Sequence, residues 1–327
     1  MIIVTGGAGL IGSAIVHALN LAGRTDIIVV DHLGNGEKWQ NLAPLRFLDY
    51  IEKDSFLKIL ESDRLDSISG KTEAVIHMGA CSSTTERDAG YLISNNFEYT
   101  KTLAIASLEA GARFIYASSA ATYGDGTRGF DDNSSVESLQ PLNMYGYSKQ
   151  LFDSWAIRHN IMGRIAGLKY FNVFGPNEYH KGDMRSMVLK AFEQITSTGR
   201  VRLFRSYLPE FPDGGQQRDF LYVKDAADMT LHFLNNRGAN GLFNIGSGTA
   251  STWNSLVAPI FEAMGRRVEI EYIDMPESIR SQYQYYTCAS IQKLKDSGYS
   301  RILTSLRDAV TDYVANYLTC GKHLGEP

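Results

Sequence analysis

The sequence predicts an α/β fold: a doubly wound, Rossmann-type parallel sheet with a smaller C-terminal α/β domain. A short apolar strand at residues 1–5 runs into a glycine-rich turn at 6–12 and then into an apolar helical repeat. A second apolar strand, 26–30, ends on an acidic residue about 20 positions after the glycines. Further short apolar segments alternate with helix-length stretches, which is typical of parallel strands joined by helical crossovers. These segments are 74–77, 113–117 and 165–170.

The glycine-rich turn predicts a dinucleotide site. Glycines between a strand and a helix allow backbone N–H groups to approach a pyrophosphate at the helix N-terminus. Asp31, at the end of the second strand, lies where this fold places a carboxylate near the adenosine ribose. Strand, turn, helix, strand and acid therefore agree with one another.

The strand and helix rhythm breaks after Gly175 and Pro176, and residues 206–215 form a proline- and glycine-rich loop. Strand-like patterns return at 241–245 and 268–272. We predict that residues 1–170 form the dinucleotide-binding domain, completed by about 215–246. Residues 171–214 and 247–327 then form mainly a substrate-binding domain that covers the carboxyl ends of the strands.

Composition excludes several classes of protein. With 327 residues, 44% hydrophobic and 21% charged, the chain can bury a large core without disulfides or metals. A net charge of −4 and a pI near 6.0 argue against nucleic-acid or anionic-membrane partners. Cys81, Cys288 and Cys320 lack metal-ligand spacing, so we expect no metal and a reducing cytoplasm. No apolar run is long enough to span a bilayer, and nothing marks export.

A tyrosine and a lysine four residues apart, Tyr145 and Lys149, begin a helical pattern after Pro141. This spacing places both side chains on one helix face. A phenol with a pKa of about 10 is a poor base unless a neighbouring cation stabilises the phenolate, and Lys149 can supply that cation. Alone, such a pair is more often a solvated helix surface.

A hydroxyl-rich turn at 117–124 follows the fourth predicted strand and contains Ser119. It can hydrogen-bond a substrate alcohol, or it can simply satisfy local backbone groups.

Together with the glycine turn, these motifs resemble the extended short-chain dehydrogenase/reductase superfamily, in which a serine or threonine, a tyrosine and a lysine cooperate in alcohol oxidation. Segments 79–86, 116–124, 170–176 and 180–182 narrow the likeness. The chain resembles the ADP-L-glycero-D-manno-heptose 6-epimerase family from its N-terminus to about Tyr313.

This resemblance implies an isomerase that inverts C6 of ADP-D-glycero-β-D-manno-heptose with bound NADP, in the synthesis of lipopolysaccharide core precursors. It also implies a homo-oligomer, a pentamer. The implied catalytic residues are Ser119, Tyr145, Lys149 and Lys181. The implied cofactor contacts are Gly6, Gly9, Leu10, Ile11, Gly12, Asp31, His32, Lys38, Lys53, Met78, Gly79, Ala80, Cys81, Ser82, Asn95, Lys149, Val173 and Lys181. The implied substrate contacts are Ser82, Asn172, Asp183, Lys190, Phe204, Arg205, Ser206, Tyr207, Arg218 and Tyr283. Met78, Asp183 and Lys190 depart from the family's usual residues at the cofactor rim and the substrate loop.

Lys181 has a chemical rationale in an epimerase. An alcohol carbon is inverted by oxidation to a carbonyl, rotation, and return of the hydride to the opposite face. Because the carbonyl oxygen points in two directions, two proton-handling groups serve better than one, which suggests Tyr145 and Lys181. Lys181 would need a depressed pKa. From residue type alone, an ordinary surface or phosphate-contacting lysine is the alternative.

Arg218 either holds a substrate diphosphate or forms a structural salt bridge with Asp219. Tyr283 either faces substrate or belongs to an aromatic packing cluster. His77 and Trp253 read as core or turn residues.

The predicted cofactor is NADP, with NAD as the alternative. Asp31 favours a free ribose 2′-hydroxyl, because a carboxylate repels a 2′-phosphate. Lys38, in the following loop, favours that phosphate, and the resembled family keeps NADP tightly bound.

Two other functions stay open at this point. One is a UDP-sugar 4-epimerase or a 4,6-dehydratase of the same fold, although Ala120 and Ala121 occupy the stretch where a dehydratase needs a carboxylate. The other is a non-catalytic nucleotide-binding protein, which would have no need of the three catalytic side chains. The expected partner is a small ADP-sugar.

Overall fold

The computed structural model describes residues 1–62, 65, 68, 70–280 and 283–327. A seven-stranded parallel sheet has the order β10-β6-β5-β4-β1-β2-β3. Its strands are β1 (Ile2–Thr5), β2 (Ile27–Asp31), β3 (Asp49–Glu52), β4 (Ala74–His77), β5 (Arg113–Ser119), β6 (Ala166–Tyr170) and β10 (Gly241–Ile245). The predicted fold class is confirmed. The predicted strands each fall within two residues of the observed ones, and the short edge strand β3 was missed.

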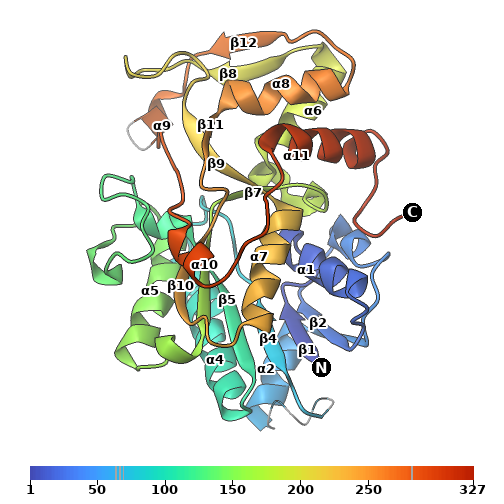
Figure 1. Ribbon diagram of the computed structural model, residues 1–327, viewed down its shortest axis with the longest axis vertical. Coiled ribbons are helices and arrows are strands. Elements are labelled where there is room, and N and C mark those ends of the chain that lie inside the picture. The colour runs from blue at the N-terminus through green and yellow to red at the C-terminus, as the bar shows by residue number, and fades with distance from the viewer. Residues whose placement is uncertain (63–64, 66–67, 69, 281–282) are drawn as a thin grey trace.

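Helices cover both faces of this sheet (Figure 1). They include α1 (Leu10–Leu21), α2 (Lys53–Ser62), α3 (Ala89–Leu92), α4 (Tyr99–Glu109), α5 (Met144–Arg158) and α7 (Val223–Asn235). Shorter helical turns are η1 (Glu37–Asn41), η3 (Ile93–Glu98), η4 (Ala120–Tyr123), η5 (Val136–Ser138), η6 (Met162–Arg164) and η7 (Tyr179–Met184).

Alternation along β1 shows how the sheet divides the core. Ile2 and Val4 join the cluster that contains α1 and α7, whereas Ile3 joins the cluster that contains α4 and α5. All four residues of β1 are buried, as expected for a central parallel strand covered on both faces. The sheet is therefore a rigid platform whose carboxyl edge carries the loops.

A smaller unit lies beyond that carboxyl edge, at the top of Figure 1. It contains a three-stranded sheet, β11-β9-β7, and a two-stranded sheet, β12-β8. Its elements are β7 (Asn172–Phe174), α6 (Met187–Thr198), β8 (Val201–Phe204), β9 (Gln217–Tyr222), β11 (Ala250–Thr252), α8 (Trp253–Ala263), β12 (Ile270–Ile273), α9 (Glu277–Arg280), α11 (Leu306–Tyr313) and η8 (Val314–Leu318). The short helix α10 (Gln292–Asp296) returns to the large sheet and packs beside β10.

Residues 241–245 pair with β6 in the large sheet, whereas 217–222 pair with β7 and β11. The chain thus crosses between the two units several times, and the domain boundaries given above stay a prediction. Along the part of the chain that the structure describes, no helix is long and apolar enough to cross a membrane.

Candidate active site

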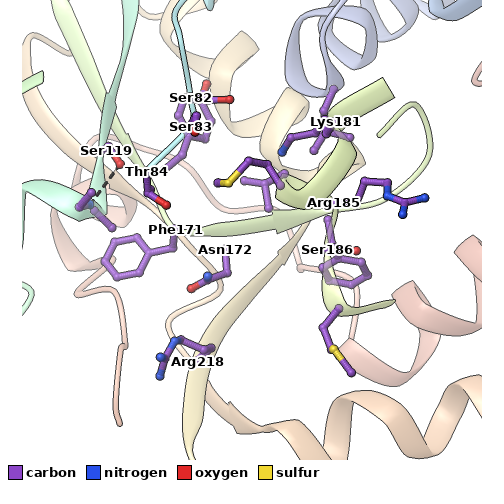
Figure 2. A pocket seen from close by; sticks show the side chains of 18 of the residues that line it. Ser82, Ser83, Thr84, Ser119, Phe171, Asn172, Lys181, Arg185, Ser186 and Arg218 are labelled. Carbon is purple, nitrogen blue, oxygen red and sulfur yellow. Dashed lines mark hydrogen bonds between the residues drawn. The ribbon is translucent and has the colours of Figure 1, made fainter. Parts of the chain in front are cut away.

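A large cavity lies between the carboxyl edge of the sheet and the smaller unit. Its volume is about 1820 Å³. Pockets for single drug-sized ligands span ~300–1,000 Å³, so this one has room for a dinucleotide and a second nucleotide. Figure 2 shows Ser119 and Lys181 entering it from opposite sides, with Asn172 and Arg218 between them and the smaller unit.

The glycine turn forms one wall. Gly6 has φ 66, and a Cβ there would lie 2.5 Å from the Gly79 nitrogen. A Cβ at Gly12 would lie 2.0 Å from the Gly6 carbonyl oxygen, so both glycines allow α1 to pack closely on the sheet. Gly9, Leu10 and Ile11 line the cavity at the start of α1, where the N–H groups have no helical acceptors. The turn therefore fits a pyrophosphate.

Asp31 ends β2 at the same wall, and its carboxylate is already hydrogen-bonded. It accepts from the Ala8 N–H at 2.8 Å and from the His32 N–H at 2.7 Å. Lys38 forms an ion pair with it at 2.5 Å. Asp31 and Lys38 both line the cavity. Because the carboxylate is partly neutralised, this corner accepts an added phosphate more readily than a bare aspartate would.

The remaining predicted cofactor residues fall into two groups. Those in the cavity wall are Met78, Gly79, Ala80, Cys81, Ser82, Lys149, Val173 and Lys181. The other three, His32, Lys53 and Asn95, do not line the cavity. His32 pairs with Glu52 at 2.8 Å, and Lys53 donates to Asn95 at 2.9 Å.

Tyr145 and Lys149 lie on α5, as the spacing predicted, and both line the cavity. The helix begins after Asn143, whose side chain accepts from the Gly146 N–H at 2.8 Å and caps the first turn. Gly146 has a reason to be glycine, because a Cβ there would lie 2.7 Å from the Ala121 carbonyl oxygen. This close approach brings Tyr145 to the turn that carries Ser119.

Burial dominates the protonation of this pair. It raises the pKa of Tyr145, whereas interaction with the Ser119 side chain lowers it. Burial lowers the pKa of Lys149 to about 8, against attraction from Asp153 and Cys81. The Lys149 ammonium donates to the Ala117 carbonyl at 2.9 Å. The interaction with Ser119 therefore favours the Tyr145 phenolate against the effect of burial.

Ser119 caps the η4 turn, where its hydroxyl accepts from the Ala121 N–H at 3.1 Å. Thr122 donates to the Ser119 carbonyl at 2.8 Å, and Lys169 donates to Thr122 at 2.6 Å. The hydroxyls of this turn satisfy local groups, and Ser119 also lines the cavity beside Tyr145, so contact with a substrate alcohol stays a prediction.

Lys181 enters the cavity from η7 (Figure 2). Among the residues that the structure describes, its ammonium has no hydrogen-bond partner. Burial lowers its pKa, while the Glu178 carboxylate acts in the opposite direction. A partly buried amine with a depressed pKa gives up its proton more easily than a solvated lysine does.

Arg218 is buried in the cavity wall and is not paired with Asp219. Asp219 faces the other side of β9, where it accepts from the N–H groups of Ser247, Gly248 and Ala289. The salt-bridge alternative is therefore wrong, because successive strand residues point to opposite faces. Arg218 donates to the Gln217 carbonyl at 2.8 Å, and its other N–H groups have no hydrogen-bond partner among the residues that the structure describes.

Two aromatic rings flank this guanidinium. Its central carbon lies 5.2 Å from the Tyr283 ring centre and 5.8 Å from that of Trp253. Trp253 Nε1 donates to the Tyr283 hydroxyl at 3.0 Å, and both residues line the cavity. Trp253 is thus a wall residue of the site, which the sequence analysis placed only in a core or turn. His77 is a core residue as predicted, bonded to Thr5 and Thr100.

The predicted substrate loop is only partly in the wall. Ser82, Asn172, Lys190 and Phe204 line the cavity. Asp183, Arg205, Ser206 and Tyr207 do not line it. The Asp183 carbonyl accepts from Lys190, and the Ser206 N–H donates to Asp213. Arg205 donates to the Tyr272 carbonyl, and the Tyr207 hydroxyl donates to Asp274. Phe171, His180, Gln284 and Thr287 line the cavity as well and were not predicted. The first three lie beside the predicted site residues Asn172, Lys181 and Tyr283, a signal that Thr287 lacks. The three cysteines are free, and the described residues contain no group of ligands that could hold a metal ion.

Comparison with known proteins agrees with this geometry. Residues 2–246 match the NAD dependent epimerase/dehydratase family. A glycine turn at a helix start with Ser119, Tyr145 and Lys149 beside it is the site expected of that class, and it fits a nicotinamide cofactor.

Closer relatives narrow the class. The chain is 55% identical over 320 residues to ADP-L-glycero-D-manno-heptose-6-epimerase from Nitratidesulfovibrio vulgaris (strain DP4), covering 97% of this chain and 98% of that protein. It is 47% identical over 329 residues to the Fusobacterium nucleatum protein of the same name, with coverages of 97% and 98%. The crystal structure of Helicobacter pylori ADP-L-glycero-D-manno-heptose-6-epimerase superimposes with a TM-score of 0.79 at 26% identity, covering 96% of this chain and 95% of that one. The chain belongs to the ADP-L-glycero-D-manno-heptose-6-epimerase family, a family of isomerases within the NAD dependent epimerase/dehydratases.

Proposed function

We propose that the protein inverts C6 of the heptose in ADP-D-glycero-β-D-manno-heptose, giving the L-glycero epimer for lipopolysaccharide core precursors. The observation that carries the proposal is that Tyr145 and Lys181 line one cavity from separate elements, α5 and η7. Two proton-handling groups on different walls suit a carbonyl that must be reduced in either of two orientations. The family membership supports the substrate over a UDP-sugar and over a role without catalysis.

The bound nicotinamide supplies a hydride acceptor that later returns the hydride. Tyr145, beside Ser119, handles the hydroxyl proton in one orientation of the carbonyl, and Lys149 holds positive charge near it. Lys181 handles the proton in the other orientation. Its pKa is lowered by burial, so loss of the proton costs less than for a solvated lysine.

Arg218 holds the substrate diphosphate in this proposal. A buried guanidinium with free N–H groups in a cavity wall is a strong anion site, because its hydrogen bonds to phosphate are charge-assisted and often bidentate. Cation–π contacts with the Tyr283 and Trp253 rings help to hold the guanidinium in place.

NADP is the proposed form of the cofactor. Lys38 neutralises Asp31 at 2.5 Å and lies at the cavity wall, where it can turn toward a ribose 2′-phosphate. A homo-oligomer, a pentamer, and a cytoplasmic location belong to the same proposal; the free thiols are in keeping with a reducing compartment. Light scattering coupled to size exclusion measures the oligomer.

The direct test is to incubate purified protein with ADP-D-glycero-D-manno-heptose and to resolve the two C6 epimers chromatographically. We expect conversion toward an equilibrium mixture without added nucleotide, because the hydride returns in each cycle. Mass spectrometry of the denatured supernatant should release NADP. A protein that consumes stoichiometric external cofactor would be a net dehydrogenase, and the proposal would fall.

A further inference from the structure

One buried amide connects the cofactor wall with the loop that carries Lys181. Asn41 ends η1, three residues after Lys38, and is 1% exposed. Its Nδ2 donates to the Ala8 carbonyl at 2.8 Å and to the Asn177 carbonyl at 2.9 Å. The same nitrogen lies 3.2 Å from His180 Nδ1. Ala8 belongs to the glycine turn, and Asn177 and His180 belong to the approach to Lys181.

The oxygen of the same amide is held by a third part of the chain. Asn41 Oδ1 lies 2.8 Å from His323 Nδ1. Next to His323, the Leu324 N–H donates to Asn177 Oδ1 at 2.9 Å, and the Tyr179 hydroxyl donates to the Lys322 carbonyl at 3.0 Å. Residues 322–324 therefore hydrogen-bond both Asn41 and the loop that precedes Lys181.

The side chains of the three residues from Asn177 to Tyr179 are anchored by hydrogen bonds. Asn177 donates to Ser13 at 2.9 Å, Glu178 accepts from the Ser186 hydroxyl at 2.6 Å, and Tyr179 donates to the Lys322 carbonyl. His180 follows, in contact with Asn41, and the Lys181 ammonium has no hydrogen-bond partner among the described residues. The three anchors thus hold the backbone from which Lys181 reaches into the cavity.

We propose that Asn41 is a positioning residue for epimerisation: it joins the glycine turn to the Lys181 loop, so that the two walls keep a fixed distance. The inference rests on the proposed role of Lys181. Burying an amide costs free energy unless its groups are hydrogen-bonded. Here the contacts of Asn41 join three segments, which are the glycine turn, the loop before Lys181 and residues 322–324, so the amide specifies their relative placement. A shift of about 1 Å in a reacting group can cost ~10²-fold in rate.

The first test replaces the amide without changing its size. Asn41→Asp keeps the shape but has no N–H to donate, and Asn41→Ala removes the group. We expect each to lower kcat by ~10-fold or more with KM changed less than ~3-fold. The matched control is Asn244→Ala, which removes another fully buried amide that bonds Phe130, Ser290 and Tyr123. It should lower the melting temperature comparably and leave kcat within ~3-fold.

A double-mutant cycle separates positioning from general damage. If Asn41 acts through Lys181, then adding Asn41→Asp to Lys181→Met should lower kcat by no more than ~2-fold further. If the double variant lost kcat by the product of the two single losses, the inference would be overturned. A loss of kcat in Asn244→Ala equal to that in Asn41→Asp would also overturn it.

A second measurement does not depend on turnover. Lys181 is labelled with an amine-acylating reagent in the purified protein, and its labelling is divided by that of Lys295, an exposed lysine of α10. Asn41→Asp should change this ratio by ~3-fold or more, because the loop is released, while Asn244→Ala leaves it at the parental value. An unchanged ratio in Asn41→Asp overturns the inference. A parental kcat in Lys181→Met instead overturns the proposed role of Lys181, so the two failures are distinguishable.

Should neither Asn41 variant fold, His323→Ala provides the decision. It removes the tie behind Asn41 together with the contacts of His323 to Gln40 and to the Tyr179 ring, and it leaves the bonds from Asn41 to Ala8 and Asn177 in place. The labelling ratio of Lys181 should then rise by ~2-fold. The parental ratio in that variant overturns the inference.

Discussion

The two cavity walls that carry the proposed proton-handling groups, Tyr145 and Lys181, are built in different ways. Tyr145 lies in the first turn of α5, a 15-residue helix whose start is capped by Asn143. Lys181 lies in η7, a short turn interrupted at Gly182, where φ is 52. The first wall is held by a regular element on the sheet, the second by single hydrogen bonds to distant segments. A local motif can therefore encode Tyr145, whereas the place of Lys181 depends on residues far away in sequence.

The largest effect should come from the helical wall. Tyr145→Phe removes the hydroxyl that exchanges a proton and should lower kcat by ~10²–10⁴-fold. Fold and bound nucleotide should be retained, as measured by circular dichroism and mass spectrometry. Tyr147→Phe, at an exposed position of the same helix, is the control and should turn over normally. Near-parental epimerisation by Tyr145→Phe would show that Tyr145 does not exchange the proton.

Lys181→Met tests the loop wall. We expect kcat to fall by ~10²-fold with a small change in the Kd for ADP-heptose measured by calorimetry, because a proton-handling group acts in the transition state. With an aldehyde at C6, two substrate molecules can dismutate to acid and alcohol on the bound nucleotide. Lys181→Met and Tyr145→Phe should impair this reaction unequally, since each serves one orientation. Parental kcat with weakened binding would make Lys181 a phosphate anchor and leave Tyr145 as the sole proton handler.

Arg218→Met should show the opposite division between binding and rate. Losing charge-assisted hydrogen bonds to the diphosphate should raise the substrate Kd by ~10–100-fold while kcat falls less. Calorimetry with ADP alone checks the location of the contact, because ADP carries the diphosphate and lacks the sugar. If ADP binds equally to Arg218→Met and to the parental protein, the guanidinium does not hold the diphosphate.

The sequence predicted the features that depend on local spacing and missed those that depend on distant segments. The glycine turn, Asp31 and the Tyr145 and Lys149 pair depend on spacings of a few residues, and the structure places all of them in the cavity wall. The long apolar strands were found for the same reason. The short strands β3, β7, β8 and β11 were missed. They have three or four residues and are partly exposed, so they lack the continuous apolar run that marks β1 and β4, which have four residues and are buried throughout.

The contacts of Arg218, on β9, had no local signal in the sequence. Arg218 and Asp219 are neighbours in sequence, yet β9 sends them to opposite faces, so adjacency suggested a salt bridge that does not exist. Trp253 is the first residue of α8 and directly follows β11. It contacts Arg218 because β11 pairs with β9, which carries Arg218. Such pairings are set by the tertiary fold, and a single sequence does not display them.

Lys38→Met probes the cofactor corner. Removing the ammonium leaves Asp31 without its 2.5 Å ion pair, so the carboxylate should repel a 2′-phosphate. We expect NADP affinity to fall by ~10-fold and NAD affinity to change little, measured by fluorescence titration of protein freed of nucleotide. Equal losses for NADP and NAD would mean that Lys38 contacts a group the two cofactors share.

The smallest effect is a pH dependence of stability that originates at Lys149. Burial lowers its pKa from 10.5 to about 8 in the folded protein. Between those values the unfolded chain binds more protons, so the contribution of Lys149 to the free energy of unfolding increases as pH rises through this window. Below about pH 8 both states are protonated and the buried charge only costs stability. Lys149→Met should therefore be more stable than the parental protein at neutral pH, with a gap that narrows toward pH 10.5 by at most about 3 kcal/mol. Urea unfolding of both nucleotide-free proteins across this range measures the gap. A gap that stays constant would mean that Lys149 keeps an ordinary pKa, and the helical wall would then hold a permanently charged lysine beside Tyr145.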